Sequence, residues 1–153
     1  MKRFLIWITA VFVMISTAAC GIESRQEQVR SSLGPCERIA FYSSGGFQDY
    51  TDFGIYRCPD AELKDNPYFE PVTSADLARL WGFLDNFEGW IDTIGRSDPG
   101  NEVVVNYAFD RSIVDTGDWL YIYEGENYPQ FGCYDIWLLD SQSGMLYYFH
   151  NNI

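Results

Sequence analysis

The residue with the broadest chemical use in this chain is its single histidine, His150. A Ser-His-Asp triad, or a zinc site with histidine ligands, would have to be built around this residue. The four cysteines do not show the Cys-x-x-Cys spacing of many zinc sites. We therefore expect His150 to be an ordinary residue at the end of a strand, and we expect no catalytic residue, metal site or cofactor.

Acidic side chains form several loose groups. They are Asp49 and Asp52; Asp60, Glu62 and Asp65; Asp110, Asp115 and Asp118; and Glu124 and Glu126. A carboxylate pair can hydrolyse a glycoside, but only at a defined separation and with one raised pKa, and the spacing here indicates neither. Residues 110–118 lack the Asp-x-Asp-x-Asp-Gly rhythm of a calcium loop. The pattern favours solvated turns.

One stretch, residues 119–134, combines aromatic and acidic side chains. If its loop over residues 124–132 exposes Tyr128 and Phe131, the loop could contact a protein or stack on a sugar ring. The candidate partner patch consists of Tyr123, Glu124, Glu126, Tyr128 and Phe131. In the alternative interpretation, the aromatic residues of this stretch pack across neighbouring strands.

The first residues have the pattern of an export signal. Lys2 and Arg3 precede a mostly apolar run over residues 4–15, which is followed by small residues up to Cys20. Thr17-Ala18-Ala19-Cys20 resembles the lipobox of bacterial lipoproteins, with Thr17 where an aliphatic residue is usual. The resemblance implies a signal peptide over residues 1–19 and lipidation of Cys20. It also implies anchoring to the outer face of the cytoplasmic membrane or in the outer membrane.

Two alternatives to lipidation remain open. Ordinary signal peptidase also cuts after small residues, which would release a secreted or periplasmic form. A retained transmembrane anchor ranks lower, because the uncharged residues 4–19 fall short of the roughly 20 that span a bilayer.

The remaining 134 residues, 20–153, suit a single domain. Eight of the ten Lys and Arg residues lie here with all 22 Asp and Glu residues, so the formal net charge of this part is −14. Such a surface repels nucleic acid and anionic lipid, and we expect neither as a direct partner. The high aromatic content argues against disorder.

The cysteines couple the anchor to the disulfide pattern. If Cys20 carries lipid, Cys36, Cys58 and Cys133 remain. Cys36 and Cys58 bracket a predicted hairpin that places them opposite each other, so we predict a disulfide between them. Cys133 is then a free thiol, or it pairs with Cys20 if that residue is not acylated.

The sequence pattern predicts an α+β fold in one small domain. Residues 20–34 are predicted to be a lipidated N-terminus and polar tether, and residues 35–153 the globular domain. An N-terminal β-hairpin is followed by an amphipathic helix that begins at Thr73 or Ser74 and ends near Gly89 or Gly95. Alternating residues then predict an antiparallel meander of four strands, at residues 103–108, 119–123, 134–139 and 145–149. The helix is expected to pack on this sheet.

The leading functional hypothesis is a non-enzymatic envelope lipoprotein that binds a partner, most simply a protein, through its sheet face or its aromatic loop. One alternative is a cell-wall carbohydrate-binding module, or a hydrolase that uses a carboxylate pair. Another is an immunity or inhibitor protein whose acidic face blocks a basic target.

Overall fold

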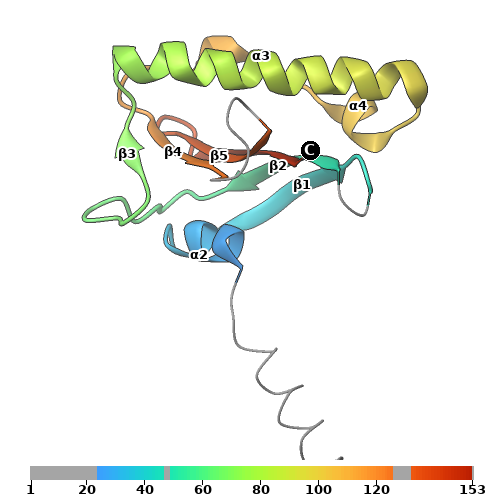
Figure 1. Cartoon of the computed structure of the whole chain (residues 1–153). Helices are drawn as coiled ribbons and strands as arrows, with labels where there is room; N and C mark the ends of the chain where they lie inside the picture. Colours follow the sequence, from blue (N-terminus) through green and yellow to red (C-terminus); the bar gives the residue numbers. More distant parts are fainter. Residues whose placement is uncertain (1–23, 47–48, 126–131, 153) are drawn as a thin grey trace, which may run out of the picture.

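The structure of the chain, a computed structural model, describes residues 24–46, 49–125 and 132–152. Within them lies one antiparallel sheet with the strand order β1-β2-β6-β5-β4-β3. The strands are β1 (Glu37–Ser43), β2 (Tyr50–Arg57), β3 (Glu70–Pro71), β4 (Trp119–Glu124), β5 (Cys133–Asp140) and β6 (Met145–Asn152). Figure 1 shows helix α3 (Ser74–Ser97) over one face of this sheet and helix α2 (Arg25–Ser31) on the other. The predicted α+β fold is confirmed.

The N-terminal hairpin forms as predicted. Strands β1 and β2 pair from Glu37 opposite Arg57 to Ser43 opposite Asp52, and the Cys36–Cys58 disulfide closes the open end. Strand β2 also pairs along its whole length with β6, the last strand of the chain. This long-range pairing joins the N-terminal hairpin and the C-terminal strands into one sheet.

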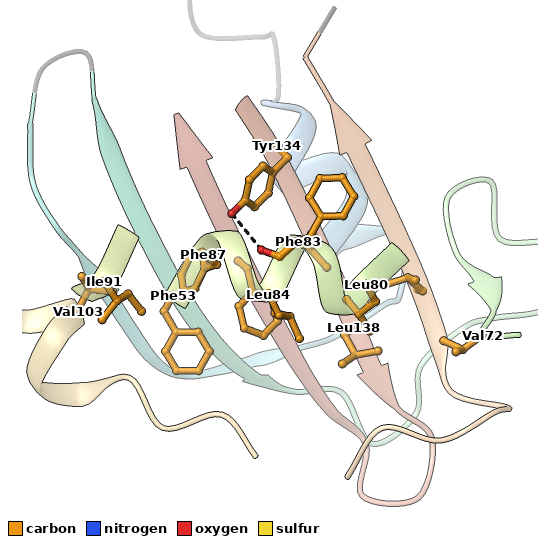
Figure 2. Close-up of a cluster of buried hydrophobic side chains, with 13 residues drawn as sticks. Phe53, Val72, Leu80, Phe83, Leu84, Phe87, Ile91, Val103, Tyr134 and Leu138 are labelled. Atoms are coloured by element: carbon orange, nitrogen blue, oxygen red, sulfur yellow. Dashed lines mark hydrogen bonds between the residues drawn. The ribbon is translucent and has the colours of Figure 1, made fainter. Parts of the chain in front are cut away.

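Helix α3 begins at a capping box in which Thr73 accepts from the Asp76 backbone N–H and the Asp76 carboxylate accepts from the Thr73 backbone N–H. Its apolar stripe packs on the sheet. Figure 2 shows Phe83, Leu84 and Phe87 pointing towards the strands, and the Tyr134 hydroxyl from β5 donates to the Phe83 carbonyl (3.5 Å). The buried helix residues are Leu80, Phe83, Leu84, Phe87 and Ile91. Each such side chain contributes about 1.5–3 kcal/mol by burial.

The predicted tether was wrong for residues 24–34. Ser24 caps helix α2, and Val29 and Leu33 are fully buried in a second core on the opposite face of the sheet, with Trp137 and Tyr148. The prediction failed because helix α2 is polar except for its one buried face. The sequence alone does not show that the sheet covers this face. The domain therefore begins at Ser24 or before it.

The predicted strand over residues 103–108 was also wrong, so the strands that follow α3 within the described residues are β4, β5 and β6. Helix α4 (Glu102–Asn106) covers the first part of this segment instead. Asn101 caps the helix by accepting from the Val103 backbone N–H. Val103 is buried against α3 and the sheet, whereas Val105 is 64% exposed. Three successive valines favour a strand locally. The cap and the burial of Val103 outweigh that preference.

Candidate functional site

The most unusual feature of the described residues is a row of buried polar side chains on the α2 face of the sheet. Asp52 of β2 lies opposite His150 of β6, and His150 lies opposite Asp135 of β5. Asp52, His150 and Asp135 are 7%, 5% and 7% exposed. We call these three residues the acid–histidine row. Ionisable side chains are seldom this buried unless they are paired.

Asp135 is the acceptor at one end of the row. Its Oδ1 lies 2.7 Å from Nδ1 of His150 and accepts from the Tyr148 hydroxyl (2.7 Å) and from Gln26 Nε2 of α2 (3.3 Å). Burial and the nearby Asp135 carboxylate raise the pKa of Tyr148, which keeps its hydroxyl protonated as a donor. The Asp135 carboxylate thus brings together two residues of the neighbouring strand β6 and a residue of helix α2.

Two groups in the row have no hydrogen-bond partner among the described residues. They are Nε2 of His150 and Oδ1 of Asp52, and these two residues are paired in the register of β2 and β6. Burial raises the pKa of Asp52, and a hydrogen bond from Ser43 and the attraction of His150 oppose that increase. The Tyr50 ring covers the imidazole at a centroid distance of 4.7 Å. The imidazole of His150 therefore belongs to a residue paired with an acidic residue on each side, Asp52 and Asp135.

An Asp–His pair of this kind also resembles the base of a nucleophilic enzyme, in which Nε2 contacts a serine or cysteine. Here Nε2 contacts no such group within the described residues. Cys133 lies two positions before Asp135 on β5 and is half-buried without a disulfide to any described residue. Burial, and then Asp135, raise the pKa of its thiol, which lowers its reactivity.

The structure describes two residues of the predicted partner patch, and both are engaged within the domain. The guanidinium of Arg25 lies 3.6 Å from the centre of the Tyr123 ring, and Arg79 of α3 pairs with Glu124 (2.6 Å). The other three residues of the patch, Glu126, Tyr128 and Phe131, lie outside the described residues, as does Cys20. The patch as a whole stays a prediction.

Several other acidic residues hold turns. Asp110 accepts from the Ser112 backbone N–H and Asp140 from that of Gln142, as expected for solvated turn caps. Asp118 differs, because it is buried and accepts from both the backbone and the hydroxyl of Ser141. In the part of the chain that the structure describes, no three His, Cys, Asp or Glu side chains are grouped to hold a metal ion.

The acid–histidine row was missed because its members are far apart in sequence. A signal was present, since Asp135 and His150 both interrupt the buried face of apolar strands, which is an unusual place for a charge. Connecting these residues required knowledge of which strands pair and in which register. No protein-family model, curated protein or solved structure matches the chain.

Proposed function

We propose that this chain is an exported lipoprotein, attached to a membrane through Cys20, whose domain is a non-enzymatic module that binds a partner protein along strand β1. The Cys36–Cys58 disulfide supports export, because such bonds persist in oxidising compartments. Among the described helices, none is long and apolar enough to cross a bilayer. The anchor in this proposal is the lipid, as the lipobox-like residues 17–20 suggest.

The start of the domain gives the proposal a geometric consequence. Helix α2 begins at Arg25, five residues after Cys20. An extended chain covers at most about 3.5 Å per residue, so a lipidated Cys20 holds α2 within about 18 Å of the membrane surface. The domain then lies against the membrane, and this proximity limits which of its surfaces a partner can reach.

The observation that carries the binding proposal is the exposed edge of the sheet at β1. Ile39 and Phe41 are 48% and 38% exposed, and β1 is the first strand in the sheet order. An apolar edge strand is a template for an added strand from another chain. The other edge is closed differently, by the two-residue strand β3 that ends at Pro71.

The free part of this edge is limited. The Ser43 backbone N–H donates to Glu102 at the start of α4 (2.9 Å), which occupies the edge at that end. The register with β2 shifts between Arg38 and Ala40, which bends the strand at the other end. A partner strand would therefore pair around Ala40 to Tyr42, next to the exposed ring of Phe41.

The partner we propose is an extended segment that has apolar residues at alternate positions and flanking basic residues. Alternate side chains of an added strand would meet Phe41 on one face of the sheet, and Ile39 lies next to this segment at the register shift. Basic flanks follow from the formal charge of −14 over residues 20–153, which steers cationic partners towards the domain. Pairing with β1 of a second copy is the alternative outcome.

The first experiment tests the anchor. The full chain and its Cys20→Ser variant are produced in bacterial cells, and the cells are fractionated. We expect the original chain in the membrane fraction, with a mass that includes acyl chains, and the variant in the soluble fraction. An unmodified mass, or a disulfide between Cys20 and Cys133, would contradict lipidation.

The second experiment tests the edge. Proteins cross-linked to the chain in the cell envelope are identified, and a peptide with the proposed pattern from the captured protein is added to the purified chain. We expect new amide-exchange protection over residues 40–42, and its loss in the Ile39→Ser/Phe41→Ser variant. Val105→Ser, at another exposed apolar residue, is the matched control. Protection elsewhere, equal binding by the double variant, or β1 pairing between two copies would refute the proposal.

A further inference from the structure

A cavity of about 370 Å³ lies on the α3 face, at the end of the domain where the β1–β2 hairpin, the last turns of α3 and the start of α4 meet. Its walls include Ser44, Trp90, Asp98, Asn101 and Asn152. Its volume is within the range of small-molecule sites. It is separate from the acid–histidine row, which is on the α2 face.

Trp90 is the large apolar surface of this cavity. It is half-buried on α3, between the core residues Phe87 and Ile91. Within the described part of the chain, Trp90 belongs to neither of the two hydrophobic cores, whereas Trp81, on the same helix, packs against the larger one. The fold therefore leaves the indole at the cavity wall without a role in core packing.

The polar wall of the cavity is held in place. The Asn101 side chain donates to the Ser44 carbonyl (3.0 Å) and to the Asp98 carboxylate (3.3 Å), so it joins the hairpin to the turn after α3. On the sheet side, the Thr51 hydroxyl donates to Asn151 Oδ1 (2.9 Å). Residues with amide, hydroxyl and carboxylate groups thus line the same cavity as the indole, and these hydrogen bonds hold several of them in place.

The lining chemistry distinguishes between classes of ligand. The lining residues within the described chain include Asp49 and Asp98 but no Lys or Arg, which disfavours an anion. A quaternary ammonium prefers a cage of several aromatic rings. Tyr50 also borders the cavity, but its ring packs on His150, on the opposite face of the sheet. Trp90 is then the one ring at the wall.

We propose that this cavity binds a neutral saccharide. A sugar ring presents an apolar C–H face that can lie on the indole of Trp90, and an edge of hydroxyl groups that both donate and accept hydrogen bonds. Carboxylate oxygens of the lining match the donors of that edge, because each carboxylate can accept several hydrogen bonds. The site is independent of β1, so the chain could hold a glycan and a protein partner at the same time.

Calorimetric titration tests this proposal with the full chain in a detergent that has no sugar headgroup. The probes are soluble tetramers of N-acetylglucosamine and of glucose, with choline as a comparison. We expect saturable binding of at least one tetramer. We expect binding to weaken about tenfold in Trp90→Ala and less in Trp90→Phe, which keeps a ring for stacking.

Three further variants make the test specific. Arg96→Ala, on the same helix but outside the cavity lining, should bind as the original chain does. Ile39→Ser/Phe41→Ser should also keep its saccharide binding, so failure at β1 and failure at the cavity can be told apart. Asp98→Asn removes one carboxylate of the cavity wall but keeps a hydrogen-bonding side chain, so saccharide binding should weaken by about threefold without being lost.

Certain results would overturn the proposal. They are the absence of saturable binding to both tetramers, unchanged binding in a folded Trp90→Ala variant, or choline binding that Asp98→Asn abolishes. Urea unfolding of each variant establishes that it is folded. Trp90→Ala should lower the midpoint less than truncation of a fully buried residue such as Phe87, because the indole is only half-buried.

Discussion

Nδ1 of His150 lies 2.7 Å from Oδ1 of Asp135, across the pair of strands β5 and β6, and both side chains are at least nine-tenths buried. The same oxygen accepts from Tyr148 and Gln26, so one carboxylate joins two strands to helix α2. Removing one partner of a buried network leaves the other groups desolvated without compensation. The network therefore matters for stability whether or not it has a further role.

Asp135→Ala should destabilise the domain by about 3 kcal/mol, because it leaves Tyr148, His150 and Gln26 without their acceptor. Urea unfolding at neutral pH measures the change. Asp92→Ala, at an exposed acid on α3, should stay within about 0.5 kcal/mol of the original chain. Equal effects of the two substitutions would show that the network contributes little.

Asp52→Asn should stabilise the domain at neutral pH. Burial raises the pKa of Asp52, with Asp135 and Glu102 adding to the increase, while Ser43 and His150 oppose it. A raised pKa favours the protonated form in the fold. The resulting stability is complete below the unfolded pKa, about 3.9, and is lost as pH rises through the folded pKa.

Urea midpoints over a pH series check this sign. The Asn variant should unfold at higher urea than the original chain at neutral pH, and the two curves should converge below about pH 4. Asp92→Asn serves as the exposed control. A variant that is less stable at neutral pH would mean that attraction between ionised Asp52 and protonated His150 outweighs the cost of burial.

Val29→Ala should cost about 2 kcal/mol of unfolding free energy, because it leaves a cavity between α2 and the sheet. Val105→Ala removes the same atoms from a side chain that is 64% exposed and should cost less than about 0.5 kcal/mol. Thermal or urea unfolding compares them. If the two variants are equally stable, α2 does not belong to the folded domain in solution.

Replacing both Cys36 and Cys58 with Ala should destabilise the domain by about 3 kcal/mol. The bond joins residues 22 positions apart, and its loss gives the unfolded chain more conformations. Non-reducing peptide mapping verifies the pairing, and urea unfolding measures the cost. Cys133→Ala, at a cysteine without a described disulfide, should change stability by less than about 1 kcal/mol. A larger effect at Cys133 would point to a different pairing.

Features set by neighbouring residues were predictable from the sequence. The α3 cap at Thr73, its apolar stripe, the two hairpins and the Cys36–Cys58 bond each depend on residues at most a few turns or one hairpin apart. Helix α4 was mistaken for a strand because Val103, Val104 and Val105 also fit an extended pattern. Burial of Val103 against α3 and the sheet decides between the two, and that contact is not local.

His150 shows the same division between local and non-local information. The sequence determined that His150 is the single histidine and that it lies on a C-terminal strand. Only the tertiary structure decided that Asp52 and Asp135 flank it, because this depends on β6 lying between β2 and β5 in one particular register. A shift by one residue would turn these side chains to the other face of the sheet. The placement of Trp90 at a cavity wall likewise depends on how the hairpin, α3 and α4 meet.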